Sequence, residues 1–203
     1  MSHSPTLRLD SLMTGLFYLG LGLCGGPVFM AIRPELFVEG DPAATLANLV
    51  DREGLARLGI ALELGTVTFQ ALAAVWFARL FRHVDASVAN AVALFGMVNA
   101  VATLTSATLV SGSLDAALAG SGVFDPAIIQ LLFQISSRFW DSGAIFFGLW
   151  LIPMGWLVLK GKYGPPVLAW ILIIGGAGYV ASVFIGVLVP EAGLWVAVLP
   201  LLA

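Results

Sequence analysis

Four polar side chains recur along one side of an apolar stretch between residues 130 and 153. Gln130, Gln134, Arg138 and Asp141 are separated by four, four and three residues, so on a helix they form one continuous stripe. An arginine fork suits carboxylate and phosphate groups, and neighbouring amides add hydrogen bonds. The pattern therefore favours a stripe that faces a bundle interior or a water-filled outer vestibule and could hold a polar or anionic ligand.

Glu63 lies in a different apolar run and supplies a second acid to this polar layer. Counting about 20 residues back from Leu159 places Arg138 and Asp141 near the outer boundary of a hydrocarbon core, and Glu63 comes to a similar depth. Two interpretations stay open. Either the three ionisable groups form a closed ionic network that fixes helix register, or the acids hold Arg138 ready for a ligand that enters from outside.

Two amides extend the same hypothesis along other helices. Gln70 follows Glu63 by two turns on one face, and Asn99 lies in the next apolar run. Amides inside a membrane helix usually bond to neighbouring helices, which is the structural alternative for both. The candidate ligand-binding residues are Glu63, Gln70, Asn99, Gln130, Gln134, Arg138 and Asp141.

The sequence carries no catalytic motif that would turn this layer into an active site. It contains no GxSxG, HExxH, CxxC or phosphate loop, and no base completes a triad around Asp141 and Ser142. A single cysteine and two histidines leave few soft metal ligands. We expect no catalytic residue, no metal and no cofactor, and an intramembrane enzyme ranks last.

Composition determines which elements must position these groups. The 203 residues are 60% hydrophobic and 10% charged, whereas soluble domains carry about 25% charged residues. Apolar runs of about 20 residues match a hydrocarbon core about 30 Å thick, where backbone groups must bond within their own helix. We therefore predict an all-α, polytopic transmembrane helical bundle in one domain, residues 1–203.

The predicted bundle has five full spans and a partial or truncated sixth. The final apolar segment, 194–203, has only ten residues and would rise only about 15 Å as a helix. Asp41 and Pro42 predict the start of a short outer interfacial helix between the first two spans. The full spans are expected at about 12–32, 58–81, 86–110, 126–159 and 167–189.

The distribution of basic residues predicts a multi-pass protein of the plasma membrane with its N-terminus in the cytoplasm. With a cytoplasmic N-terminus, the outer basic residues all fall in the long first loop, where acids offset them, and the remaining outer connections have none. This arrangement places Arg33 in the outer loop with Arg52 and Arg57. The inner basic residues are then Arg8, Arg79, Arg82, Lys160 and Lys162.

Two stretches resemble a known family. RFWDSGAIFFGLWLIPMGWLVLKGKYGPPVLAWILIIGGAGYVASVF and GDPAATLANLVDREGLARLGIALEL are similar to domain-of-unknown-function family 4386, a family of bacterial multi-pass membrane proteins. The resemblance implies a six-helix integral membrane protein and carries no activity. The chain departs from the family pattern at Arg138, where a histidine or another polar residue is expected nearby, and in its short last helix.

Two function hypotheses follow from the sequence. The first is a membrane protein that binds or moves a small polar, anionic or lipid-like ligand at the outer polar layer. The second is a non-catalytic accessory or structural subunit whose polar layer is a closed ionic network. Candidate partners are membrane lipids, a small polar or anionic ligand, and a protein partner or second copy of the chain. The formal charge of −3 gives no indication of nucleic acid.

Overall fold

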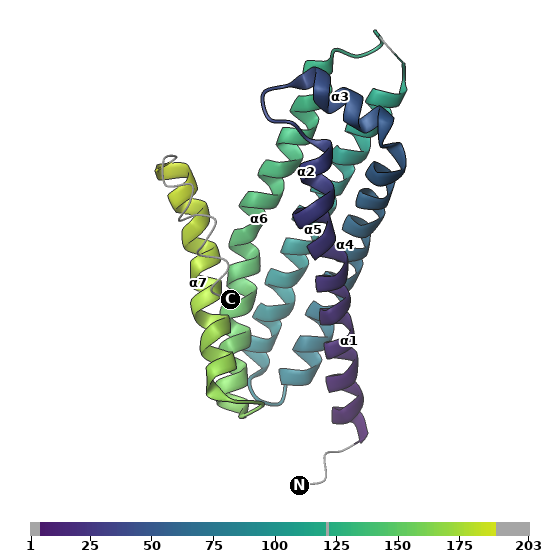
Figure 1. Cartoon of the computed structure of the whole chain (residues 1–203). Coiled ribbons are helices and arrows are strands. Elements are labelled where there is room, and N and C mark those ends of the chain that lie inside the picture. Colours follow the sequence, from purple (N-terminus) through teal and green to yellow (C-terminus); the bar gives the residue numbers. More distant parts are fainter. Residues whose placement is uncertain (1–4, 121, 190–203) are drawn as a thin grey trace. The chain divides into compact units, whose positions relative to one another are not determined.

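The computed structural model describes residues 5–120 and 122–189, and every regular element in these ranges is helical. This confirms the predicted all-α class. The elements in chain order are α1 (Pro5–Pro27), the π-helix η1 (Val28–Ile32), α2 (Arg33–Leu36), α3 (Pro42–Asp51), α4 (Glu53–Phe81), α5 (Ala86–Leu118), α6 (Pro126–Gly161) and α7 (Pro166–Leu188) (Figure 1).

The described residues contain five helical stretches long and apolar enough to cross a membrane. They confirm the five predicted spans and a multi-pass membrane protein. The predicted partial span, 194–203, lies outside the described residues. The stretches are Leu7–Leu36, Glu53–Phe81, Ala86–Leu118, Pro126–Gly161 and Pro166–Leu188.

The first span extends further than the apolar run indicates. The sequence places Arg33 in a loop after about Ile32, but η1 and α2 continue the helical backbone through Arg33 to Leu36. The prediction that Arg33 lies in the outer loop is therefore wrong. The apolar run ends at the charged Arg33, but the helical backbone hydrogen bonds continue beyond it to the end of α2.

The chain forms two compact units. Four helices contribute residues to both units: α1, α4, α5 and α6. Unit 1 comprises Met1–Tyr18, Gln70–Asn99 and Asp141–Ala203, and unit 2 comprises Leu19–Phe69 and Ala100–Trp140. A single domain stays a prediction.

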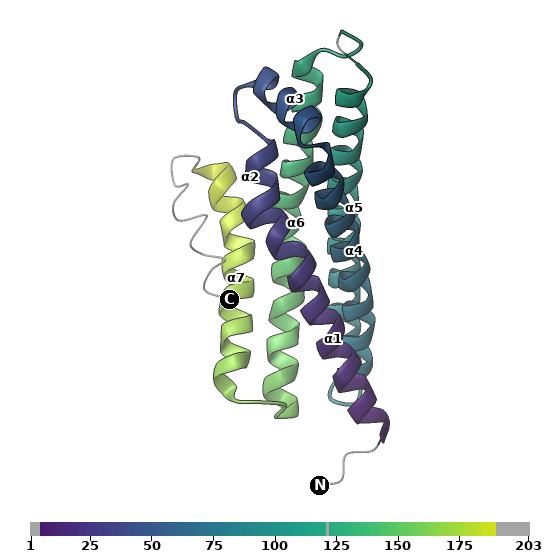
Figure 2. The same ribbon diagram turned by 45° about the vertical axis from the view of Figure 1, so that its right-hand side comes forward.

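Unit 1 packs around a buried tryptophan and a glycine contact. The Trp150 ring lies 5.8 Å from that of Phe77 and 5.6 Å from that of Phe147. Helix α7 runs beside the second half of α6 (Figures 1 and 2). A Cβ atom on Gly176 would lie 2.7 Å from the Gly148 carbonyl oxygen, so the two backbones approach closely.

Unit 2 has its hydrophobic core beneath α3. Leu49 of α3 is fully buried in one cluster with Leu36, Ile129 and Phe133. Asp41 caps α3 by accepting a hydrogen bond of 2.9 Å from the backbone N–H of Ala44, so the helix begins where the sequence predicts. Its position at a membrane surface stays a prediction.

Candidate functional site

Unit 2 contains a buried ion pair between Arg33 of α2 and Glu63 of α4. The Nε atom of Arg33 donates to Glu63 Oε1 at 2.7 Å, and Nη2 lies 2.6 Å from the same oxygen. Arg33 is 9% exposed and Glu63 is 2% exposed. Two charges taken out of water in this way are stable only when each is closely paired.

Serine hydroxyls surround the two terminal guanidinium nitrogens, of which Nη2 also contacts Glu63. Nη2 donates to Ser106 Oγ at 2.7 Å and to Ser136 Oγ at 2.9 Å, and Nη1 donates to Ser137 Oγ at 3.3 Å. Ser136 Oγ also lies 3.0 Å from the backbone oxygen of Ser106, to which it donates. The network therefore ties together α2, α4, α5 and α6 within unit 2.

Two aromatic rings complete the surroundings of the arginine. The guanidinium carbon lies 5.4 Å from the centre of the Phe29 ring and 5.5 Å from that of Phe133. Cations within about 6 Å of an aromatic face are attracted by the ring quadrupole, more strongly where water is absent. The rings thus hold the charge in place without using any of its N–H donors.

The π-helix directs Arg33 towards this network. Pro27 has no N–H to donate, and η1 begins at the next residue. The Arg33 N–H then bonds to the oxygen of Val28, five residues back instead of four. One extra residue in a turn rotates the following side chains by about 100° relative to an uninterrupted α-helix. This rotation sets the side of the helix from which Arg33 projects.

One oxygen of the ion pair is left open. Arg33 makes both of its contacts to Oε1 of Glu63, and the buried Oε2 has no hydrogen-bond partner among the described residues. Buried polar atoms are almost always hydrogen-bonded, so an orphaned carboxylate oxygen calls for a missing donor. The site thus offers one negatively polarised acceptor beside a neutralised arginine.

The predicted stripe on α6 is partly buried and partly exposed. Gln130 is buried and its Nε2 donates to the backbone oxygen of Val38 at 2.8 Å, whereas Gln134 and Arg138 are exposed. Within the described residues Glu63 pairs with Arg33 rather than with Arg138. The reason is geometric, because Arg33 is carried inward by η1 while Arg138 projects from the exposed side of α6.

The remaining predicted residues belong to unit 1. Gln70 is 1% exposed, and neither atom of its amide has a partner in the described part of the chain. Asn99 is half-buried and Asp141 is exposed. The seven candidates are therefore divided between the units, and their role in ligand binding stays a prediction.

Sequence reasoning singled out Glu63 but missed its partner. Arg33 follows directly on an apolar run, and Pro27 is a signal that the hydrogen-bond register could change there. Ser136 gave no signal, because a serine in a membrane helix is ordinarily bonded to its own backbone or to a neighbouring helix. Among the described residues, no group of three or more histidine, cysteine, aspartate or glutamate side chains could hold a metal ion.

Comparison with known proteins gives a family and no activity. No curated protein matches the chain, and no solved structure does. The family model for a domain of unknown function, DUF4386, matches residues 13–203. This range covers nearly the whole chain and includes Arg33, Glu63 and the three serines, and it confirms the resemblance found in the sequence. The chain therefore belongs to the DUF4386 family of domains of unknown function.

Proposed function

We propose that this multi-pass membrane protein binds a small polar ligand at the Arg33–Glu63 pair. The observation that supports the proposal is the buried Oε2 atom of Glu63, which has no donor among the described residues. A purely structural pair would use both carboxylate oxygens, because a fork of two parallel hydrogen bonds is the stronger arrangement. Here one oxygen takes both contacts and the other remains open.

The chemistry of the open position selects the ligand class. The pair is electrically neutral overall, and the position beside Oε2 accepts hydrogen bonds. A phosphate or carboxylate would have to displace Glu63 from the guanidinium, at the cost of a buried acid without its counter-ion. A ligand with N–H or O–H donors, such as an amine or alcohol headgroup, adds the missing bond without that cost.

Membrane location strengthens the functional interpretation. Both residues lie in helical stretches long and apolar enough to cross a bilayer, where ionisable groups are costly and rare and usually mark a functional site. Replacing a whole buried ion pair by neutral side chains is often neutral or stabilising, so stability alone does not explain its retention.

Thermal unfolding of the purified protein in detergent tests the proposal, with ethanolamine as the probe and inorganic phosphate for comparison. The control is the double variant Arg33→Gln/Glu63→Gln, which removes both charges together and leaves no unpaired one. We expect ethanolamine to raise the unfolding temperature of the wild type and to leave that of the double variant unchanged. Equal shifts in both proteins, or none in the wild type, would contradict ligand binding at this pair.

A second candidate function is a non-catalytic structural subunit. It is favoured by the engagement of Arg33, whose Nε and Nη2 both have acceptors within hydrogen-bonding distance. In that case ethanolamine would have no effect. Either single glutamine variant would still be destabilised by about 3–5 kcal/mol, because it leaves a buried charge unpaired.

A further inference from the structure

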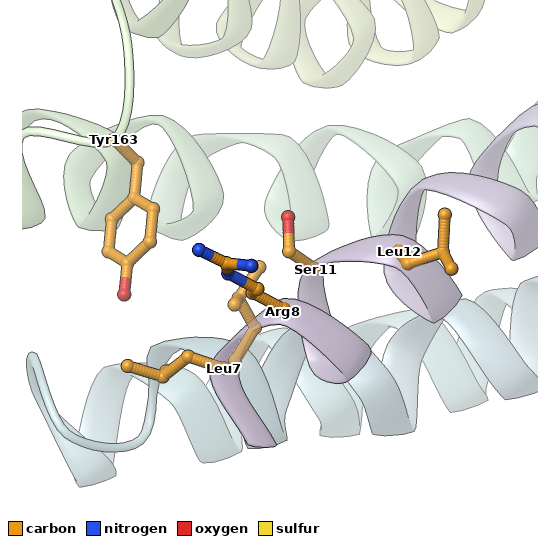
Figure 3. A pocket seen from close by; sticks show the side chains of 6 residues that line it. Leu7, Arg8, Ser11, Leu12 and Tyr163 are labelled. Carbon is orange, nitrogen blue, oxygen red and sulfur yellow. The ribbon is translucent and has the colours of Figure 1, made fainter. Parts of the chain in front are cut away.

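A pocket of about 370 Å³ is lined by residues of unit 1, whereas the Arg33–Glu63 pair belongs to unit 2, so an inference from the pocket does not depend on the role proposed for that pair. The first turns of α1, the last turn of α4 and the turn between α6 and α7 supply its walls (Figure 3). Its volume is within the range of small-molecule sites, about 300–1,000 Å³. The lining residues are Leu7, Arg8, Ser11, Leu12, Leu80 and Tyr163.

Polar groups gather on one part of this lining. Figure 3 shows the Arg8 guanidinium extended into the space between the Tyr163 ring and the Ser11 hydroxyl. The Tyr163 hydroxyl lies 2.7 Å from His83 Nε2, and its ring packs edge-on against Phe81 at 5.2 Å. These contacts fix the ring, so the guanidinium lies beside a rigid wall.

The charges at these helix ends leave Arg8 available for a ligand. Asp10 lies 3.4 Å from Arg79, and Asp85 lies 3.0 Å from Lys160, so each acid already has a basic partner. Arg8 forms no ion pair with any residue that the structure describes, and its side chain is exposed. The helix ends of unit 1 thus carry an excess of positive charge, which attracts anions. Arg82 and Lys162 are exposed in the same way.

Leucines give the pocket a second, apolar character. Leu7, Leu12 and Leu80 line the same space as Arg8. The first membrane-spanning stretch begins at Leu7, and the second ends one residue after Leu80. The pocket therefore lies where spans end, with a cation and a hydroxyl beside apolar walls, as at a membrane–water boundary.

We propose that this pocket binds the phosphate headgroup of an anionic phospholipid. Arg8 and Ser11 donate to the phosphate oxygens, and the leucines contact the first methylene groups of the acyl chains. An arginine fork matches phosphate geometry, and charge-assisted hydrogen bonds of this kind are the strong ones. Free phosphate shares the headgroup chemistry but leaves the three leucines without a partner.

Native mass spectrometry of the full chain in detergent tests this, with phosphatidylglycerol, phosphatidylcholine and inorganic phosphate as probes. Arg8→Gln removes the proposed contact. Arg82→Gln is the matched control, because Arg82 is exposed, basic and at the same helix ends but does not line the pocket. Unfolding temperatures of both variants establish that they fold.

We expect the wild type to bind one phosphatidylglycerol in preference to phosphatidylcholine. Arg8→Gln should weaken this binding about tenfold, the loss of one charge-assisted hydrogen-bonding group, and Arg82→Gln should leave it unchanged. Equal losses in the two variants would mean general attraction to a basic surface and would overturn the pocket. Displacement of the lipid by a similar concentration of inorganic phosphate would overturn the lipid as ligand. If Arg8→Gln does not fold, Ser11→Ala replaces it, and unchanged lipid binding in that variant also overturns the proposal.

Discussion

Arg33 and Glu63 share an environment in which almost every polar atom has a partner, and the exception is informative. Three serines and two aromatic rings surround the guanidinium, whereas Glu63 uses only one oxygen. Burial makes such a network sensitive, because a low local dielectric strengthens each bond and raises the cost of each missing one. The open Oε2 atom is therefore the position at which a bound donor would change the free energy most.

Asp85 offers a pH-dependent contact outside the spans. Its hydrogen bond to Lys160, followed by that to the Val88 N–H, holds the pKa of the Asp85 carboxyl below its usual value. A lowered pKa in the folded state adds stability above the unfolded value, about 4, and this stability is lost as the pH falls through the folded pKa. Asp85→Asn should therefore be less stable than the wild type at neutral pH, with a difference that shrinks below about pH 4.

Chemical denaturation at a series of pH values measures this difference. Lys160→Gln serves as the control, because it removes the same ion pair from the other side. Adding Asp85→Asn to Lys160→Gln should cost less than the aspartate change costs alone, since the two residues are coupled. A difference between wild type and Asp85→Asn that is constant with pH would contradict the assignment.

The sequence predicted one half of the buried pair at the residue scale. Glu63 stood out because an acid inside a span must have a partner. Its partner could not be identified, because Arg33 and Arg138 are both basic residues near the expected outer boundary. Only the change of hydrogen-bond register at η1 distinguishes them, by directing Arg33 inward while Arg138 remains exposed.

At the scale of elements, α6 and α7 depend on glycines that let their backbones meet. A Cβ atom on Gly176 would lie 2.7 Å from the Gly148 carbonyl oxygen and 2.9 Å from Ile152 Cγ1. The oxygen belongs to a helical backbone and cannot move cheaply. Gly176→Ala should therefore destabilise unit 1 by about 1–3 kcal/mol, the usual cost of overpacking.

Gly112→Ala is the matched control for this substitution. Gly112 also lies inside a membrane-spanning helix, but a Cβ atom there meets nothing within 4 Å. Alanine exceeds glycine in helix propensity by up to about 1 kcal/mol, so this variant should be unchanged or slightly more stable. Denaturation in the same detergent compares the two, and equal stabilities would contradict the close α6–α7 contact.

Helix existence was predictable from the sequence, whereas helix ends were not. The five apolar runs correspond to five helical stretches, because bilayer thickness sets a minimum apolar length. The ends depend on capping and continue through polar residues, so α4 begins at Glu53 rather than near 58. Asp41 followed by Pro42 is one case in which a helix cap could be predicted from the sequence.

At the scale of the molecule, contacts within unit 1 connect the segments that the basic residues assign to the cytoplasm. Asp10 of α1 pairs with Arg79 of α4, and Lys160 of α6 pairs with Asp85 before α5. His83 bonds to Tyr163 in the turn between α6 and α7. These segments therefore lie at one end of unit 1, as the predicted topology requires.

Reporter fusions determine the side. The basic residues at this end, Arg8, Arg79, Arg82, Lys160 and Lys162, favour retention in the cytoplasm, because short positively charged segments resist translocation. A reporter that functions only in the cytoplasm should therefore be active when it is inserted after Lys162. The same reporter inserted after Ala119, between α5 and α6, should be inactive, and a reporter that needs export should show the reverse pattern. An exported reporter active after Lys162 would reverse the topology and place the Arg8 pocket in the outer leaflet, so the lipids offered to it would have to be chosen from that leaflet.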